Sequence, residues 1–192
     1  MSKLFVRKTW RLFGIIFPLV YYFGNKRITL IVVFLFLGIS LLIELFRFTL
    51  PTLNNRMFII FRHFFKETEK KGLITTTVFL ISFFITVLLF RKDIAITAML
   101  FSIFADASSA IVGIHGKKRI FSKSIEGSLA FLVTCLAIGL ALTLTKIRLV
   151  PAVFILGAFS ATIIELLPLP VDDNFTIPLA AGAVMSVISK FL

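Results

Sequence analysis

The sequence contains a single cysteine, Cys135, which excludes an intrachain disulfide and any metal site built from several cysteines. Histidine is almost as scarce, since His63 and His115 stand alone and are expected at the surface. No H-E-x-x-H motif, haem-binding pair or Ser-His-Asp triad can therefore be recognised. Acidic residues are also few, nine against 21 Lys and Arg, with a net charge of +12. These absences leave carboxylates, hydroxyls and cations as the candidates for chemistry.

The chain also lacks a polar stretch long enough to form a soluble domain. Of its 192 residues, 59% are hydrophobic and 24 are phenylalanine, and the mean hydropathy is +1.06. Soluble domains are closer to half apolar, and their apolar residues recur with a regular period rather than in long blocks. The sequence therefore predicts one integral membrane domain over residues 1–192.

The apolar blocks predict an all-α polytopic membrane protein with about seven transmembrane helices, because most blocks approach the ~20 residues needed to cross a bilayer. The first block carries Pro18 and shows no small-residue cleavage site, so we expect a retained helix and not a signal peptide. The predicted spans are 9–23, 28–46, 73–90, 94–114, 127–145, 150–167 and 174–191.

Lys and Arg are distributed unevenly between the loops of this topology. Fourteen of the 21 fall on the side of the N-terminus and seven on the other side. The positive-inside rule then places the N-terminus in the cytoplasm and the C-terminus outside. Because the cations lie between apolar blocks, we expect them to face anionic lipid headgroups, and we expect no binding to nucleic acid.

The segment 47–72 forms the longest loop on the predicted cytoplasmic side. Phenylalanines and isoleucines are interspersed there with Arg56, Arg62 and Lys66, which predicts an amphipathic helix in the membrane interface near 54–68. We expect this helix to act as an anchor or as a lid over a site. Just before it, Glu44 and Arg47 are expected to form an interfacial ion pair of little structural value.

Asp106 interrupts the fourth span about eight residues, or roughly 12 Å, from its cytoplasmic end. An acid inside an apolar segment is costly to keep and is a functional-site hypothesis by default. Its small neighbours, Ala105 and residues 107–110, allow close helix packing and also leave room for a bound group. Simple pairing with a lysine is the structural alternative.

A loop rich in glycine and lysine follows Asp106. Glycines with backbone donors, hydroxyls and lysines can hold an oligophosphate, although the spacing of a P-loop is absent. The alternative is an ordinary basic loop, in which Ser124 caps the fifth helix and Glu126 lies in its first turn. The candidate phosphate-binding residues are Gly113, Gly116, Lys117, Lys118, Ser122, Lys123 and Ser124.

A further polar run, P-V-D-D-N, separates the last two apolar blocks. Asp172, Asp173 and Asn174 are hard oxygen ligands suited to Mg²⁺, and Glu165 lies seven residues before Asp172. The alternative is a solvated acidic turn in which Asp173 or Asn174 caps the seventh helix. Both polar runs fall on the predicted cytoplasmic side. The residues alone thus predict a membrane enzyme that uses Mg²⁺ and a phosphate-bearing substrate.

Three blocks of this sequence resemble the polyprenol kinase family, which includes dolichol kinase, phytol kinase and CTP-dependent diacylglycerol kinase. Their order and spacing match over 106–179, and E-L-x-R at 44–47 extends the likeness. The blocks are D-A-S-S-A-I-V-G with the following G-K-K, then S-K-S-I-E-G-S-L-A-F from Ser122 to Phe131, and A-T-I-I-E-L-L-P-L-P-V-D-D-N-F-T-I-P-L from Ala161 to Leu179.

The sequence departs from the family pattern in two places. Ala105 stands where family members often have glycine, and Arg11 stands where many have the histidine of an R-K-x-x-H pattern that begins here at Arg7. The second departure weakens a functional role for this first segment. The chain is also short beside dolichol kinases, which points to a minimal prokaryotic member in the cell membrane.

The resemblance implies a CTP-dependent lipid kinase that transfers the γ-phosphoryl group to the hydroxyl of an isoprenoid alcohol or diacylglycerol at the cytoplasmic membrane face. It implies that lysines 117, 118 and 123 hold phosphates. Asp106, Lys123 and Glu126 would be catalytic, with Asp106 the preferred proton acceptor. The implied Mg²⁺ ligands are Asp172, Asp173, Asn174 and Glu165, and the implied substrate-side residues are Glu44 and Arg47.

Three other functions remain open at this stage: a CTP-dependent cytidylyltransferase that makes a CDP-lipid, a membrane transporter with Asp106 in its path, and a non-catalytic scaffold. The identity of the lipid and the oligomeric state are not predicted. Under the kinase hypothesis, we expect Asp106→Asn, Lys123→Ala and Asp173→Asn each to abolish transfer while folding and membrane insertion persist.

Overall fold

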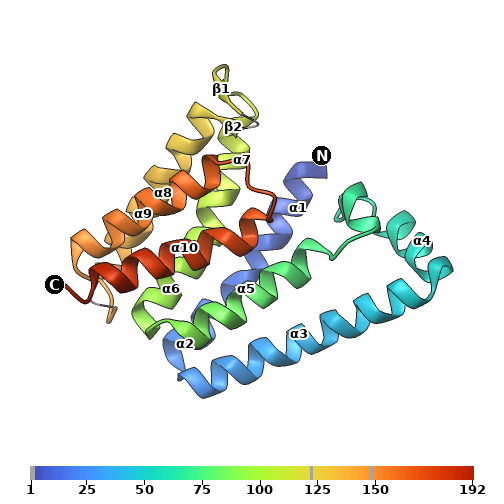
Figure 1. The fold of residues 1–192 in the computed structure, drawn as a ribbon, viewed down its shortest axis with the longest axis horizontal. Helices are drawn as coiled ribbons and strands as arrows, with labels where there is room; N and C mark the ends of the chain where they lie inside the picture. The colour runs from blue at the N-terminus through green and yellow to red at the C-terminus, as the bar shows by residue number, and fades with distance from the viewer. Residues whose placement is uncertain (1–2, 122, 148) are drawn as a thin grey trace.

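The computed structural model describes residues 3–121, 123–147 and 149–192, and it is a bundle of helices with one short hairpin at its end (Figure 1). The elements, in chain order, are α1 (Lys3–Leu12), the 3₁₀ turn η1 (Phe13–Ile15), α2 (Ile16–Phe23), α3 (Lys26–Thr49), α4 (Pro51–Ile60), the 3₁₀ turn η2 (Glu67–Lys70), α5 (Thr75–Leu89), α6 (Lys92–Leu100), the π-helical segment η3 (Phe101–Ala105), α7 (Asp106–Gly113), β1 (Arg119–Ile120), β2 (Lys123–Ser124), α8 (Ile125–Thr143), α9 (Pro151–Leu166) and α10 (Asp173–Ile188).

The prediction of a mostly helical protein with apolar helices of spanning length is confirmed. Three stretches, Lys26–Thr49, Lys92–Gly113 and Ile125–Thr143, are long and apolar enough to cross a membrane. The apolar helices α5, α9 and α10 are shorter. The all-α prediction misses one feature, an antiparallel ribbon in which Arg119 pairs with Ser124 and Ile120 with Lys123.

Polar side chains cap the beginnings of three helices, α3, α8 and α10. Asn25 caps α3 by accepting a hydrogen bond from the backbone N–H of Ile28 at 3.0 Å. Ser124 caps α8 in the same way, with Gly127 as donor at 3.0 Å, and Glu126 lies in the first turn as predicted. The cap of α10 is one residue earlier than predicted, because Asp172 accepts from the N–H of Asn174 at 2.9 Å.

The α10 helix lies near the middle of the bundle, where it packs against α9, α5 and α6 (Figure 1). Its Met185 is fully buried and fills the space left by Gly157 on α9, where a β-carbon would lie 2.5 Å from the methionine side chain. Small residues at helix crossings let backbones approach closely, which is how helices associate without a hydrophobic drive between them. This packing holds the N-terminal end of α10 beside α7 and α1.

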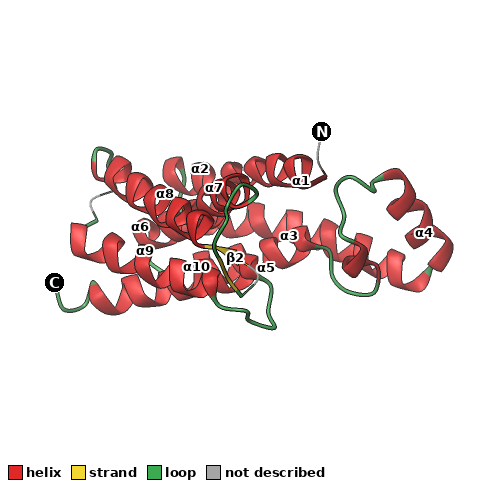
Figure 2. Cartoon of the chain, turned by 90° about the horizontal axis from the view of Figure 1, so that it is seen from above, coloured by secondary structure: helices red, strands yellow, loops and turns green. Residues whose placement is uncertain are grey.

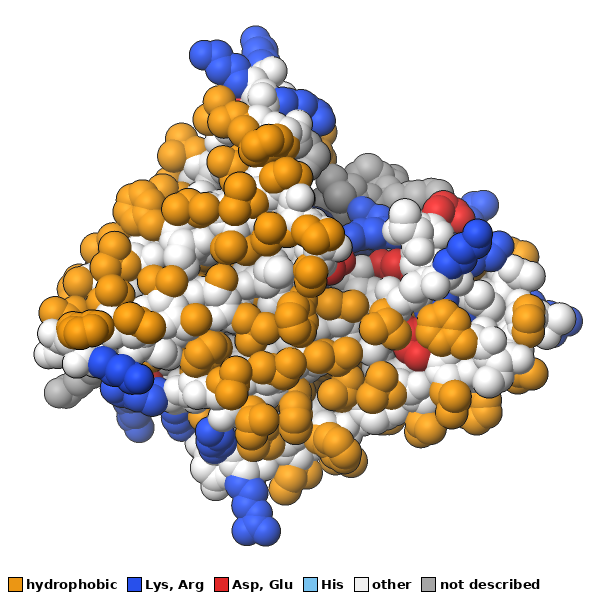
Figure 3. Space-filling view, in the orientation of Figure 1, with side chains coloured by type: hydrophobic (Ala, Val, Ile, Leu, Met, Phe, Trp, Pro, Cys, Tyr) orange, Lys and Arg blue, Asp and Glu red, His pale blue; other side chains and the backbone are white. Residues whose placement is uncertain are grey.

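On the face shown in Figure 3, apolar side chains cover much of the surface, whereas Lys and Arg gather toward its edges. On α3, a broad apolar face that includes Phe34, Leu35 and Ile39 stays exposed. Exposed apolar area of this extent is expected where lipid, and not water, is the solvent. The surface is therefore compatible with a membrane protein.

The predicted amphipathic helix near 54–68 is wrong in its extent. The helix α4 spans Pro51–Ile60, and the chain then turns over 61–65 before η2. The cause lies in Arg47, which donates to the carbonyl oxygens of Glu69 at 2.9 Å and Gly72 at 2.6 Å. Because these carbonyl oxygens must lie next to α3, residues 61–74 turn back toward α3 and form a fold-back loop (Figure 2).

The prediction that Glu44 and Arg47 form an ion pair is confirmed, but the pair is buried inside the bundle. Both side chains are buried, 3% and 0% exposed, and they are in direct contact. Glu44 also accepts from the N–H of Ile74 at 2.6 Å and from the hydroxyl of Thr77 at 3.1 Å. A buried charge is tolerated only when it is paired and hydrogen-bonded, so this pair anchors the loop to α3 and α5.

Candidate functional site

A cavity of about 730 Å³ opens where α1, η1, α7, β2 and the start of α10 meet the fold-back loop. Its lining contains both charged and apolar residues. The charged lining residues are Arg7, Lys8, Arg11, Lys66, Glu69, Asp106, Arg119, Lys123 and Asp173. The apolar lining residues include Phe13, Phe17, Phe36, Phe64, Phe65, Phe79, Leu80 and Ile74. A space of this form suits a molecule with an anionic head and an apolar body.

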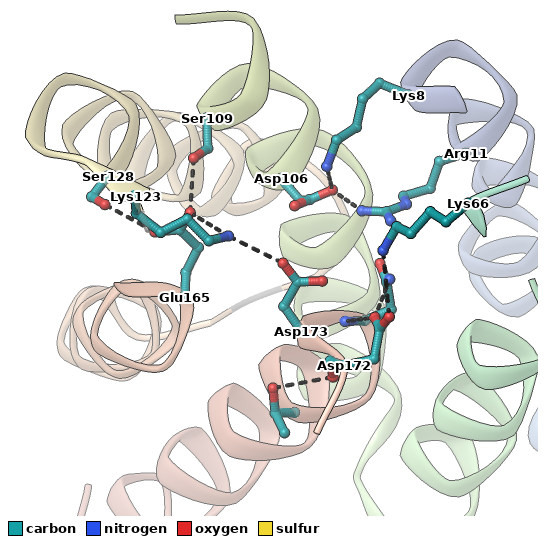
Figure 4. Close-up of polar contacts among 12 residues, drawn as sticks. Lys8, Arg11, Lys66, Asp106, Ser109, Lys123, Ser128, Glu165, Asp172 and Asp173 are labelled. Atoms are coloured by element: carbon teal, nitrogen blue, oxygen red, sulfur yellow. Dashed lines mark hydrogen bonds and ion pairs between the residues drawn. The ribbon is translucent and has the colours of Figure 1, made fainter. Parts of the chain in front are cut away.

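Asp106, one of the charged lining residues, is 3% exposed and contacts the side chains of Lys8 and Arg11 (Figure 4). The position follows from the helix just before it, because the π-helical segment η3 adds a residue to the turn and α7 then begins at Asp106. Such π segments occur frequently at functional sites. The sequence hypothesis that Asp106 pairs with a cation is confirmed, with two cations in place of one.

Lys123 bridges two acids from different helices. Its ammonium nitrogen lies 3.1 Å from Glu165 Oε1 on α9 and 3.2 Å from Asp173 Oδ2 on α10 (Figure 4). Burial alone would lower the pKa of Lys123, but the negative charges of Asp173 and Glu165 outweigh it, so this pKa lies above its ordinary value. Lys123 is therefore a fixed positive charge at neutral pH.

Glu165 is almost fully buried behind Lys123 and has both oxygens occupied. Oε1 accepts from the hydroxyl of Ser109 at 2.9 Å, and Oε2 accepts from the hydroxyl of Ser128 at 2.9 Å. Ser109 belongs to α7 and Ser128 to α8, so this one carboxylate joins three helices below the cavity. Its role in the described structure is to hold Lys123 and to fix the helices that surround it.

Asp172 is the residue immediately before the first residue of α10. One oxygen caps α10, and the other is 3.7 Å from the ammonium nitrogen of Lys66 in the fold-back loop. Both side chains of this pair are partly exposed, so its contribution to stability is small. The contact nevertheless brings the loop, with Phe64 and Phe65, to the edge of the cavity.

Several predicted phosphate-binding and catalytic residues do not line this cavity. Lys117 and Lys118 are exposed, and their backbone N–H groups donate to Glu126 Oε1 at 3.0 Å and 3.4 Å. Glu126 therefore shapes the loop and does not line the cavity. Glu44 and Arg47 do not line the cavity either. Ser122 lies outside the described residues.

The glycines of the loop serve close packing. A β-carbon on Gly116 would lie 2.4 Å from the side chain of Ser124, and one on Gly127 would lie 2.9 Å from the backbone oxygen of Ser109. A β-carbon on Gly113 would lie 3.1 Å from Ser124 Oγ and 3.8 Å from the α-carbon of Gly127, and Gly113 also borders the cavity. Without side chains, these positions let α7 and α8 meet and thereby place Lys123 over the cavity.

The predicted magnesium ligands do not form one cluster. Among residues 3–121, 123–147 and 149–192, no three His, Cys, Asp or Glu side chains gather as a metal site. Glu165 fits poorly because its oxygens are already occupied, and Asp172 caps a helix. Asp173 lines the cavity and fits better, since Mg²⁺ in nucleotide sites is commonly held by one or two carboxylates together with phosphates.

Sequence reasoning missed Lys8 and Arg11, because the departure from the R-K-x-x-H pattern argued against that segment. A signal was present, since residues three apart on a helix share a face, and two cations on one face just before an apolar segment need a partner. Lys66 was noted only for amphipathicity. Asp106 is the acid that could have predicted where Lys8 and Arg11 go.

No family model matches this sequence, and no solved structure matches it. The chain is similar to an uncharacterized protein of Rickettsia prowazekii (strain Madrid E), with 28% identity over 181 residues. The match covers 91% of this chain and 89% of the relative. The two proteins therefore align along nearly their whole lengths.

Proposed function

We propose that this protein is a membrane kinase that transfers the γ-phosphoryl group of CTP to the hydroxyl of a lipid alcohol, either an isoprenoid alcohol or diacylglycerol. The observation that carries the proposal is the cavity, in which six cations and an aromatic, apolar lining share one space. The cations favour the binding of phosphate groups, and the apolar lining favours the binding of a lipid body. The choice of CTP comes from the sequence resemblance to polyprenol kinases alone.

The reaction needs positioning and charge neutralisation more than covalent chemistry by the protein. The lipid hydroxyl oxygen forms a bond to the γ-phosphorus, the bond from that phosphorus to the β–γ bridging oxygen breaks, and CDP leaves. Lys8, Arg11 and Lys123 are the cations that we place around the phosphates. All three are held by acids, so they need little reorganisation when the anion arrives.

We assign different roles to the two acids that line the cavity beside these cations. Asp106 is a positioning residue, because it already contacts Lys8 and Arg11 and a metal ion would have to displace one of them. Asp173 is partly exposed to the cavity and is the carboxylate that we place nearest the reacting groups. Bound Mg²⁺ would neutralise phosphate charge, with Asp173 as its protein ligand.

The proposal includes a topology of about seven spans with the N-terminus and the cavity at the cytoplasmic face. Lys8 at the beginning of the chain, the loop that carries Lys123 and the α9–α10 connection all meet at one end of the bundle. The uneven distribution of Lys and Arg supports that end as the cytoplasmic one. A lipid hydroxyl lies at headgroup level, where this end of the bundle would be.

The test uses purified protein in detergent with Mg²⁺, γ-labelled CTP and a panel of lipid alcohols. We expect label in one lipid class, and a loss of at least about 10²-fold in Lys123→Gln. Lys117→Gln is the matched control, because Lys117 lies in the same loop but outside the cavity, and it should retain activity. Pyrophosphate release with a phospholipid substrate, and no labelled lipid, would instead establish a cytidylyltransferase.

If neither labelled lipid nor pyrophosphate appears with folded protein, the proposal is wrong and transport becomes the next function to test. A donor panel in which ATP is preferred would overturn only the assignment of CTP. The variant Asp173→Asn should lose activity with Lys123→Gln, since the two side chains are 3.2 Å apart.

A further inference from the structure

A second cavity, of about 750 Å³, lies at the opposite end of the bundle from the one described above. Its lining comes from the α2–α3 connection, the α5–α6 connection and the segment after α8. Four cations border it, Lys26, Arg91, Lys92 and Lys146, together with the aromatic rings of Tyr21 and Tyr22. The one acid among its described lining residues is Asp93, which is 3.0 Å from Arg91.

Two of these lysines are held in place by backbone carbonyls of the neighbouring helix pair. Lys26 Nζ donates to the carbonyl oxygen of Leu88 at 2.8 Å, and Lys92 Nζ donates to that of Gly24 at 2.8 Å. Lys92 also lies over the ring of Tyr21, 5.7 Å from its centroid. Each ammonium group has three N–H donors, so each keeps donors for a further acceptor.

The helix directions add to the positive potential. Both α3 and α6 begin at this cavity, at Lys26 and Lys92, and the N-terminal end of a helix carries partial positive charge and unpaired N–H groups. Charge, donors and helix ends therefore all favour an anion with several acceptor oxygens. A phosphate group has that chemistry.

We propose that this cavity binds the phosphate headgroup of an anionic phospholipid in the leaflet opposite the first cavity. A lipid is favoured over a soluble phosphate because exposed apolar side chains lie in and next to the lining segments. Leu89 lines the cavity and is 65% exposed, Phe23 follows the lining residue Tyr22 and is 82% exposed, and Leu144 lies two residues before Lys146 and is 85% exposed. Acyl chains would cover these side chains while the headgroup contacts the lysines.

The experiment measures lipid binding by the full-length protein and does not use transfer activity, so its outcome is independent of the proposed kinase function. Purified protein is titrated with phosphatidylglycerol and with phosphatidylcholine, and bound lipid is counted by native mass spectrometry. We expect phosphatidylglycerol to bind more tightly. Lys146→Gln should weaken its binding about fivefold, the usual effect of one cation near a charged lipid surface.

Two further variants make the test specific to this cavity. Asp93→Asn removes the acid from the lining and should strengthen phosphatidylglycerol binding. Lys190→Gln, a matched control after α10 and outside the lining, should leave it unchanged. Lys146 lies in a connecting segment, and its exposed side chain makes no hydrogen bond or ion pair with the described residues, so its replacement should not disturb folding.

Three results would overturn the proposal. Equal affinity for the two lipids would show that headgroup charge is not recognised. An equal loss in Lys190→Gln and Lys146→Gln would show a general effect of net charge and no site. Inorganic phosphate that binds as tightly as the lipid, and is weakened by Lys146→Gln, would show that the cavity takes a soluble anion.

Discussion

Three cations at the candidate site, Lys8, Arg11 and Lys123, are each held by an acid on a different element. Asp106 on α7 holds Lys8 and Arg11 of α1, while Asp173 on α10 and Glu165 on α9 hold Lys123. These pairs are buried or partly buried, so they are weakly screened by salt. Single substitutions should therefore reveal both how the charges are held and what they do.

Replacing Asp106 with Asn should lower stability as well as activity. The change leaves Lys8 and Arg11 without their acid in a largely buried place, and removing one partner of a buried pair typically costs about 3–5 kcal/mol. Thermal unfolding of the purified protein in detergent measures the loss. From the sequence, this variant is expected to fold normally, because the family resemblance makes Asp106 the proton acceptor and not part of a buried ion-pair network.

A second substitution separates the two effects of Asp106. Lys8→Gln combined with Asp106→Asn removes one unpaired cation and should recover part of the stability without restoring transfer. If Asp106→Asn alone unfolds at the wild-type temperature, the ion pairs do not stabilise the fold and the assignment of Asp106 as a positioning residue fails.

The raised pKa of Lys123 predicts a pH dependence at the alkaline end. A lysine whose pKa is higher in the folded state stabilises the fold fully below its ordinary pKa of 10.5 and ceases to do so as pH rises through the folded value. The difference in unfolding temperature between wild type and Lys123→Met should thus be constant near neutral pH and shrink above pH 10.5. The exposed Lys118, changed to Met, should show no such trend, and a difference that already vanishes near neutral pH would contradict the pairing.

At the scale of elements, the crossing of α7 and α8 determines where Lys123 stands. Gly127→Ala should destabilise the protein, because the new β-carbon would lie 2.9 Å from the backbone oxygen of Ser109 and the helices would have to separate. Gly38→Ala in α3 is the matched control, since nothing lies within 4 Å of a β-carbon there. It should be neutral or stabilising by roughly 0.5–1 kcal/mol.

Unfolding temperatures of the two alanine variants check this prediction. Equal effects would mean that the helices separate without cost and that the contact does not position Lys123. Transfer activity of Gly127→Ala, measured well below its unfolding temperature, should also fall if the helix crossing aims Lys123 at the cavity.

The sequence predicted the helical segments well because long apolar blocks and capping residues act locally. Ser124 illustrates this, since a hydroxyl before an apolar run needs no distant partner to cap a helix. The fold-back loop could not be predicted, because its end is fixed by Arg47 reaching carbonyl oxygens 22 and 25 residues away. The partners of Asp106 were missed for the same reason, as Lys8 lies 98 residues from it.

For the whole molecule, the decisive prediction concerns the orientation in the membrane. We expect Lys117→Cys and Lys146→Cys, each in a Cys135→Ala background, to react with a membrane-impermeant maleimide from opposite sides. Both positions are exposed, and they flank α8. Lys146→Cys should react in intact cells and Lys117→Cys only after the membrane is opened.

Cys135 is fully buried, and it is replaced by alanine in both variants. The Cys135→Ala protein without an added cysteine gives the background labelling signal. The opposite labelling pattern would reverse the proposed orientation and place the first cavity outside the cell. Reaction of both positions from the same side would show that α8 does not cross the membrane.

The cavity at the proposed catalytic site joins segments that leave the ribosome at very different times. Lys8 and Arg11 belong to the beginning of the chain and Asp173 to α10, so a nascent chain of fewer than 173 residues lacks part of the site. During synthesis, Asp106 can meet α1 early, whereas Lys123 must wait for α9 and α10 before its acids arrive. A stalled or truncated chain would therefore enter the membrane with an open, incompletely paired site and would not act on its substrate prematurely.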